Sequence, residues 1–321
     1  MQTRTTPAPN PQEVSKAELM GKSFCFAIAS DSHATSKYAQ PTALNQFVKY
    51  AYEAYGVRHI MVPGDLTDGA FVYRGHLDEM IPQARPMDRT RVWMTAEAAV
   101  QTLDFYFPKY DGLTYFAMGG NHDRTLLTNS GMDPIRMICE RRPDFHYGGY
   151  DKYSVRLTEK SYIRLIHPTG GVPYARSYRL QKGIENLAFE ALRQAMLEDQ
   201  PPMISVLVLA HFHLTSHSPE PPLHGILAGC FQGQTPYLQT KLLVPHIAGV
   251  IVEMTFDNLG KPRIFSHIPV YFNEIKDDWQ DWPTPLISDP SLAPDNLGDM
   301  ISVTGKQPKD LTKEIAKPKD N

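Results

Sequence analysis

Short apolar runs alternate with segments of helical periodicity along most of the chain. Runs of strand length occur at residues 23–30, 59–62, 114–118 and 204–210. Between them, apolar residues recur at the three- and four-residue spacing of a helix, in segments near residues 41–55, 99–107 and 184–196. This alternation predicts an α/β fold, with further β structure in the C-terminal third.

Two other segments refine this picture. The apolar runs at residues 153–157 and 162–166 are separated by a short polar stretch, which predicts a hairpin or two adjacent strands. Residues 69–94 follow neither period and are rich in Arg, Pro and Met. We interpret them as an insertion that covers one end of the sheet.

The two ends of the chain are more polar than its middle. Residues 1–20 are rich in Pro, Thr and Gln and predict a flexible lead, and residues 288–321 predict a disordered tail. A chain of 321 residues is long enough to bury a large core. The pattern therefore predicts a single domain over residues 21–287.

Composition narrows the classes of function without identifying one. The formal net charge is −3 and the pI is near 6.5, which does not support a protein that grips a long stretch of nucleic acid. The three cysteines are far apart and predict reduced thiols rather than a disulfide framework. The first residues lack the apolar core of a signal peptide, and no apolar run is long enough to span a bilayer. A cytoplasmic protein without a membrane partner is expected.

Polar residues of the kind that bind metals follow five of the predicted strands. They are Asp31 and His33, then Asp65, then Asn121, His122 and Asp123, then His167, and finally His211 and His213. Ligands of open α/β sheets bind beyond the carboxyl ends of the strands, so neighbouring strands would bring these residues into one crevice. Carboxylate, amide and imidazole groups without thiolate suit Mn, Fe, Zn, Ni or Co. The group is too large for one ion, and it predicts a two-metal site.

Each motif alone has an ordinary structural explanation. An Asp after a strand is commonly a turn residue or a helix cap, and Gly and Asn are common in turns. A single His after a strand is more often structural than a ligand. The ordered set of five is what favours a metal site.

This set resembles the motif of the calcineurin-like metallophosphoesterases, which in this chain has the order Asp31-x-His33, Gly64-Asp65, Gly120-Asn121-His122-Asp123, His167, His211-x-His213. The resemblance spans roughly residues 23–215. One departure is Ala210, which stands where the family usually has Gly, at a backbone position rather than a ligand position. The resemblance implies a two-sheet β-sandwich flanked by helices, with a dinuclear centre at one end.

The resemblance also implies a role for each residue. Asp65 bridges two divalent ions, the first held by Asp31, His33 and His213 and the second by Asn121, His167 and His211. Two cations lower the pKa of a shared water toward about 7 and so supply hydroxide at neutral pH. They also neutralise phosphate oxygens as charge develops in the transition state.

His122 has a different expected role, because its neighbour Asn121 already supplies an oxygen ligand. We expect His122 to protonate the leaving group as a general acid, with Asp123 orienting its ring. Asp123 could instead cap a helix, and both roles can hold. Asp68 is expected either to contact the metal-binding residues without binding metal itself or to act as a capping residue.

Three more residues are candidate substrate contacts: His76, Arg176 and Arg179. Arginine matches phosphate in a bidentate manner, although most arginines on such loops are solvated.

The expected activity is metal-dependent hydrolysis of a phosphoester substrate, with manganese as the favoured ion and a phosphodiesterase preferred. A nucleotide or nucleic-acid substrate stays open, although the net charge does not support nucleic acid. The alternative enzyme is a phosphomonoesterase acting on a nucleotide, a sugar phosphate or a phosphoprotein. The remaining alternative is a non-catalytic scaffold. Such scaffolds typically lack ligands or the central histidine, which are present here.

Overall fold

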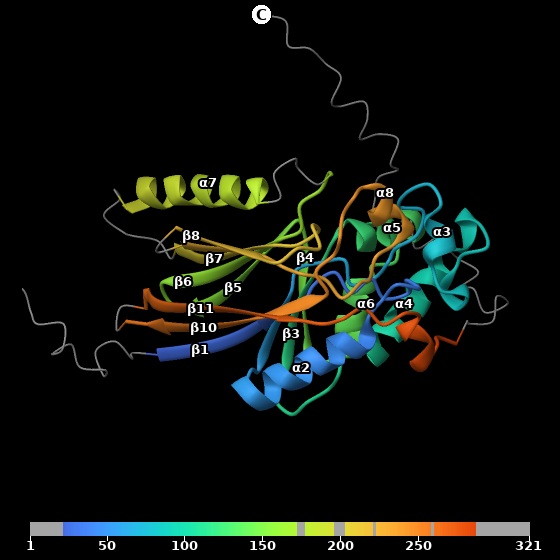
Figure 1. The fold of residues 1–321 in the computed structure, drawn as a ribbon, viewed down its shortest axis with the longest axis horizontal. Helices are drawn as coiled ribbons and strands as arrows, with labels where there is room; N and C mark the ends of the chain where they lie inside the picture. The colour runs from blue at the N-terminus through green and yellow to red at the C-terminus, as the bar shows by residue number, and fades with distance from the viewer. Residues whose placement is uncertain (1–21, 172–176, 196–202, 221–222, 258–259, 287–321) are drawn as a thin grey trace, which may run out of the picture.

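The structure, a computed structural model, describes residues 22–171, 177–195, 203–220, 223–257 and 260–286. The predicted lead and tail lie outside the described residues. In the described part, two sheets lie face to face and helices cover both outer faces, which gives the layered arrangement in Figure 1. The predicted fold, a two-sheet sandwich flanked by helices, is confirmed.

The first sheet has six strands in the order β11-β10-β1-β2-β3-β4. Its strands are β1 (Lys22–Ile28), β2 (His59–Val62), β3 (Thr114–Gly119), β4 (Phe145–Tyr150), β10 (Ala248–Phe256) and β11 (Pro262–Tyr271). The first four run parallel to one another, whereas β10 pairs antiparallel with both β1 and β11. The carboxyl ends of β1, β2 and β3 therefore lie at the same edge.

The second sheet has five strands in the order β5-β6-β7-β9-β8. Its strands are β5 (Lys152–Thr158), β6 (Ser161–Ile166), β7 (Met203–Leu209), β8 (Ser216–Glu220) and β9 (Leu223–Leu227). β6, β7 and β9 are parallel, and β5 and β8 close the two edges in antiparallel fashion. The hairpin predicted around residues 153–166 is thus β5 and β6.

The central strands of both sheets are buried on both faces. Phe26 and Ile28 of β1 pack between the sheets with Val206 and Val208 of β7, whereas Ala27 points to the helices on the other side. A strand covered on both faces needs apolar residues at every position. This explains why the sequence shows continuous apolar runs rather than strict alternation.

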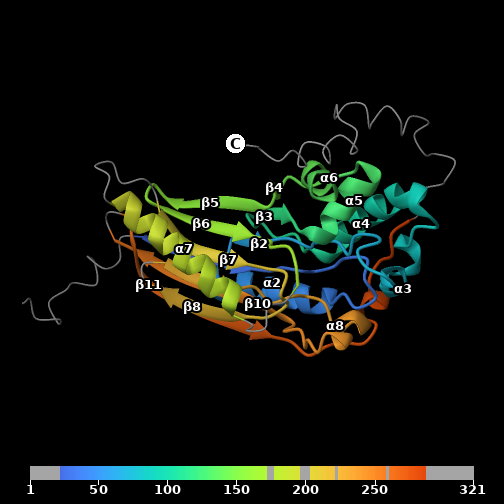
Figure 2. The same cartoon turned by 90° about the horizontal axis from the view of Figure 1, so that it is seen from above.

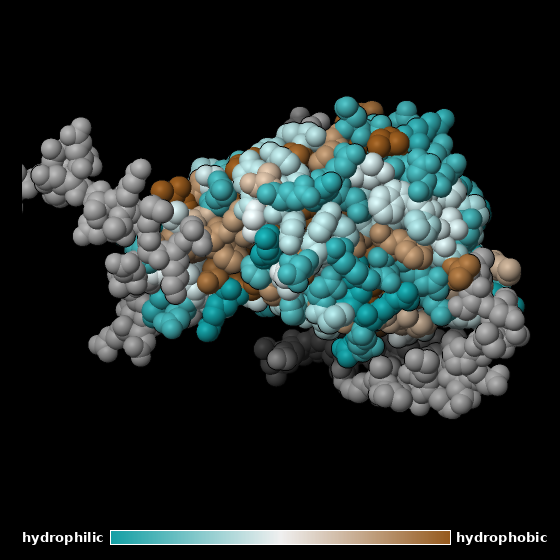
Figure 3. All heavy atoms as spheres, turned by 90° about the horizontal axis from the view of Figure 1, so that it is seen from below, coloured by the Kyte–Doolittle hydropathy of each residue, from teal (hydrophilic) through white to brown (hydrophobic). Residues whose placement is uncertain are grey.

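Helices form the two outer layers. α7 (Tyr178–Ala195) packs on β7, β8 and β9, and α2 (Pro41–Tyr55) packs on the far side against β10 (Figures 1 and 2). Besides the short α3 described below, the remaining α-helices are α4 (Val92–Tyr106), α5 (Asn121–Ser130), α6 (Pro134–Arg141) and α8 (Pro236–Thr240). Among the described residues, every helix is too short or too polar to cross a bilayer. The face seen from below, where α2 lies, is covered mainly by hydrophilic side chains, with hydrophobic ones in small groups (Figure 3).

The segment interpreted as an insertion, residues 69–94, contains three short helical pieces before α4 begins. They are α3 (His76–Glu79) and the 3-10 turns η1 (Pro82–Ala84) and η2 (Arg89–Arg91). In both ribbon views α3, α5 and α8 lie at the same end of the sandwich (Figures 1 and 2). The loops at this end carry the polar motif.

Candidate metal centre

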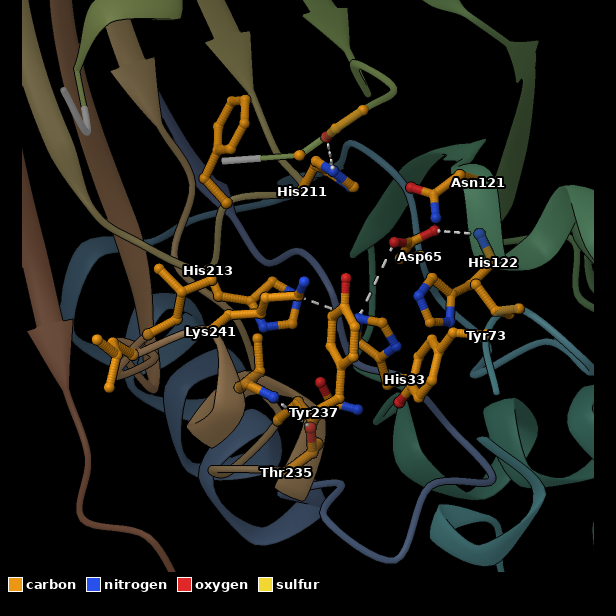
Figure 4. A pocket seen from close by; sticks show the side chains of 18 residues that line it. His33, Asp65, Tyr73, Asn121, His122, His211, His213, Thr235, Tyr237 and Lys241 are labelled. Atoms are coloured by element: carbon orange, nitrogen blue, oxygen red, sulfur yellow. Dashed lines mark hydrogen bonds and ion pairs between the residues drawn. The ribbon is translucent and has the colours of Figure 1, made fainter. Parts of the chain in front are cut away.

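Five strand ends bring the predicted metal ligands together. Asp31 and His33 follow β1, Asp65 follows β2, and Asn121 starts α5 directly after β3. His167 is the first residue after β6, and His211 and His213 follow β7. The first sheet thus supplies one set of side chains and the second sheet supplies the facing set. Figure 4 shows members of both sets around one cavity.

One group is formed by Asp31, His33 and His213, whose ligand atoms all lie within 4.8 Å of one another. His33 Nδ1 lies 3.1 Å from an oxygen of Asp68, which can only accept, so Nδ1 carries the proton. His33 Nε2 then carries a lone pair and no proton. It faces His213 Nε2 at 3.1 Å. His213 Nε2 is also 3.4 Å from Asp31 Oδ1. Three potential donors of electron pairs therefore face one point.

A second group is formed by Asp65, His167 and His211, also within 4.8 Å of one another. His167 Nδ1 donates to the Pro63 carbonyl oxygen at 2.9 Å, so its Nε2 is the nitrogen that can bind a metal ion. That Nε2 lies 3.0 Å from Asp65 Oδ2 and 3.1 Å from Asn121 Oδ1. His211 Nε2 donates to the Gly170 carbonyl oxygen at 2.7 Å, so its Nδ1 is the nitrogen left to bind a ligand.

These groups fit divalent cations. A metal-binding histidine typically donates its other ring N–H to a carbonyl or carboxylate, and His33, His167 and His211 all do so. Burial opposes a charge on His167, yet the Asp65 carboxylate raises the pKa of His167 to about 9. The surroundings therefore favour a positive charge at this point, which a metal ion can supply in place of the proton.

The backbone at the site is held in an uncommon conformation. Five of the seven predicted ligand residues have left-handed φ angles, from 43° to 78°: Asp31, His33, Asp65, His211 and His213. For a residue other than glycine this conformation costs about 1–3 kcal/mol, and such residues concentrate at functional sites. This backbone conformation turns side chains from three different strand ends, those of β1, β2 and β7, toward a common point.

A third group, His33, Asp68 and His122, is also close enough to hold an ion. Here the histidines already present Nδ1 protons to Asp68: His33 to the carboxylate, and His122 to the backbone oxygen at 2.7 Å. The polar atoms of this third group are already paired by hydrogen bonds. It is therefore a weaker candidate for a metal site than the two groups described above.

The expectation that Asp123 orients His122 is wrong. Asp123 is buried, and its carboxylate accepts from the backbone N–H groups of Leu66, Thr67 and Gly120 and from the Thr67 hydroxyl. Asp123 therefore caps the start of α5, which was the alternative role expected for it. It also joins the loop after β2 to the turn between β3 and α5. Burial, together with the charge of Asp65, raises the pKa of Asp123 to about 6.

Asp68 takes the orienting role instead. Besides the two bonds described above, its Oδ2 lies 3.0 Å from His76 Nε2. Asp68 thus supports His33 and His122 from behind, as expected in general terms, although the sequence did not indicate which histidines it contacts.

Two of the three predicted substrate contacts point elsewhere in the structure. His76 is buried against Asp68 and is not among the residues that line the cavity, so it positions Asp68 rather than touching substrate. Arg179 donates to the Thr169 carbonyl oxygen at 2.6 Å and lies over the Phe212 ring, which braces the loop after His167. Arg176 lies outside the described residues.

A cavity of about 820 Å³ opens at the predicted ligands. Its floor includes His33, Asp65, Asn121, His211 and His213, and its walls include residues that sequence reasoning missed: Tyr73, Thr235, Tyr237, Leu238 and Lys241 (Figure 4). The missed residues come from the 69–94 segment and from the loop and short helix after β9. They carry no motif, and only the fold brings them to the site.

Comparison with known proteins finds solved structures of low identity and low TM-score. No protein-family model matches the chain, and no curated protein matches it. A solved archaeal phosphodiesterase is 13% identical, with a TM-score of 0.37, over 77% of this chain and 100% of that one. A predicted phosphoesterase from Streptococcus pneumoniae is 11% identical, with a TM-score of 0.32, over 78% of this chain and 99% of that one. Vps29 from Entamoeba histolytica, solved with zinc, is 12% identical, with a TM-score of 0.32, over 78% and 100%.

The resemblance to the calcineurin-like metallophosphoesterases rests on the motif. The motif residues occur in the order typical of that family, and they meet at one end of a helix-flanked pair of sheets. The buried Asp and His groups at this end can bind metal. The case for a particular chemistry rests on these side chains.

Proposed function

We propose that this protein hydrolyses phosphoester bonds with the help of two divalent metal ions. The observation that carries the proposal is the position of Asp65 between the two groups of ligands. Its Oδ2 lies 3.0 Å from His167 Nε2 in one group and 4.0 Å from His33 Nε2 in the other. A carboxylate in this position can serve both ions. Asp31, His33 and His213 would hold one ion, and Asn121, His167 and His211 the other, with manganese favoured.

Bound divalent ions would supply an activated water molecule and would neutralise phosphate oxygens. The chain's own contribution begins with His122. Burial lowers the pKa of His122 to about 4, so the ring is neutral at pH 7. Its Nδ1 carries the proton and donates to the Asp68 backbone oxygen, and its Nε2 carries a lone pair. An anionic phosphate beside the ring would raise this pKa. His122 could then take up a proton and pass it to the leaving oxygen.

A phosphodiester is the preferred substrate because the cavity carries little positive charge of its own. Lys241 is the only Lys or Arg among the described residues that line it. A phosphomonoester is a dianion near neutral pH, whereas a diester carries a single charge and two organic arms. The tyrosine and leucine side chains of the wall suit an organic arm better than a second charge.

The direct test compares hydrolysis of bis-p-nitrophenyl phosphate and p-nitrophenyl phosphate by protein supplied with Mn²⁺. We expect a higher kcat/KM for the diester. A preference for the monoester would support the phosphomonoesterase instead. Substoichiometric metal in protein purified without chelator, together with no turnover of either ester after Mn²⁺ addition, would support a non-catalytic scaffold.

A further inference from the structure

Two tyrosines from distant parts of the sequence stack on each other in the wall of the cavity. Tyr73 belongs to the 69–94 segment, and Tyr237 is the second residue of α8. Their ring centroids are 4.3 Å apart and their planes differ by 19°. The Tyr73 ring also lies 6.4 Å from the ring of His122. The stacked pair therefore borders the position proposed for the reacting phosphate.

A buried carboxylate holds both tyrosines. Glu79 is only 7% exposed, and its Oε2 accepts from the Tyr73 hydroxyl at 2.6 Å. Its Oε1 accepts from the backbone N–H of Tyr237 at 3.3 Å. Because Glu79 lies in α3, it joins the 69–94 segment to α8. The two rings are thus oriented before a ligand arrives, which reduces the entropic cost of binding.

Tyr73 stacks on one face of the Tyr237 ring, and the ammonium group of Lys241, at the end of a flexible side chain, lies over the ring as well. Tyr237 is 40% exposed, and Lys241 Nζ lies 5.6 Å from its ring centroid. In Figure 4 Tyr73 and Lys241 lie on opposite sides of Tyr237. Leu238 and Leu243 add apolar surface to the same wall. A partly exposed aromatic ring, with apolar side chains beside it and a cation on a flexible side chain over it, suits a flat ring attached to an anionic group that the cation can pair with.

We propose that Tyr73 and Tyr237 form a stacking platform for the base of a nucleoside carried by one ester arm of the substrate. The proposal rests on the proposed phosphodiester hydrolysis and names the class of substrate. Stacking needs only the π-face that every base has, so the platform favours a nucleoside arm over a small alkyl arm without selecting one base.

The test uses two diesters that release the same p-nitrophenolate: thymidine 5′-(p-nitrophenyl phosphate) and methyl p-nitrophenyl phosphate. Because the leaving group is identical, the ratio of their kcat/KM values reports how the other arm is bound. With Mn²⁺ present, the wild-type protein should favour the thymidine ester by roughly tenfold or more, as expected for one stacked base.

Three variants locate the preference. Tyr237→Ala should reduce the ratio by roughly tenfold, whereas Tyr237→Phe keeps the ring and should keep most of the ratio. Phe189→Ala is the matched control, since Phe189 is an aromatic residue that is 71% exposed on α7 and lies outside the cavity lining. It should leave both rates unchanged. A ratio in Tyr237→Ala equal to that of the wild type would overturn the platform.

Failure of the platform and failure of the proposed hydrolysis give different results. Turnover of both esters without preference contradicts the platform alone, and turnover of neither contradicts the hydrolysis. Calorimetric titration with thymidine 5′-monophosphate and with inorganic phosphate then tests the platform without turnover. The nucleotide should bind roughly tenfold more tightly, and Tyr237→Ala should remove the difference. Equal affinities in the wild type would refute stacking.

Discussion

His122 is fixed from one side of its ring. Its Nδ1 donates to the Asp68 backbone oxygen, and its own backbone N–H donates to Asp65 Oδ1 at 2.8 Å. The second bond ties the histidine to the proposed bridging carboxylate through the main chain, so a change of side chain leaves it in place. A substitution of His122 can therefore remove the imidazole while the backbone contact with Asp65 stays in place.

We predict that His122→Ala lowers kcat by about 100-fold or more, the usual range for loss of a proton donor, while the metal content stays the same. Steady-state kinetics and metal analysis of the same preparation measure the two effects. Asp65→Asn is the contrasting variant, because it weakens a group shared by both proposed ions and should reduce the metal content. Full activity in His122→Ala would exclude the proton-donor role.

At the scale of elements, the turn between β3 and α5 packs against the loop after β2. A methyl group added at Gly120 would lie 2.5 Å from the backbone nitrogen of Asp65 and also collide with the Asp65 carboxylate. Backbone atoms cannot move aside as a flexible side chain can, so the two loops would have to separate. The glycine is therefore required by a close approach of two chain segments.

We predict that Gly120→Ala lowers the free energy of unfolding by about 1–3 kcal/mol, the usual cost of overpacking, and also weakens metal binding. Urea denaturation and a metal titration measure these effects. Gly171→Ala is the control for stability, because an added methyl group there meets nothing within 4 Å. Equal losses in the two variants would show that the close approach is not the cause.

The elements also show what the sequence could predict. The strands that carry the ligands were predicted because their apolar runs are long and end in distinctive polar residues. The sequence pattern does not predict α5 as a helix. This helix begins at Asn121, and the residues of its first turn were interpreted as metal ligands and catalytic groups. The partner of His122 was misassigned to the adjacent Asp123, because adjacency in sequence says little about which side chains meet across two loops. Tyr237 was missed for a similar reason, since its contacts with Glu79 and Tyr73 join segments that are far apart in the sequence.

At the scale of the molecule, the proposed metal site joins the two sheets. Asp31, His33, Asp65 and Asn121 come from the first sheet, and His167, His211 and His213 come from the second. Hydrogen bonds already cross between the sheets there, from the His211 backbone N–H to Asp31 Oδ1 at 3.1 Å and from His167 Nδ1 to the Pro63 carbonyl oxygen at 2.9 Å. Metal ions at this site would crosslink the sandwich at one end, and they would also offset the strain of five left-handed residues.

We therefore predict that a chelator lowers the unfolding temperature and that Mn²⁺ restores it. Metal at 100 times its Kd stabilises the folded state by about 2.7 kcal/mol per site, which corresponds to a shift of roughly 5–10 °C for a domain of this size. Differential scanning calorimetry at several Mn²⁺ concentrations measures this shift. The His167→Ala variant should respond less, because the second group then lacks a ligand, whereas Phe189→Ala should respond as the wild type does. An unfolding temperature that is the same with chelator and with Mn²⁺ would mean that no metal ties the sheets together.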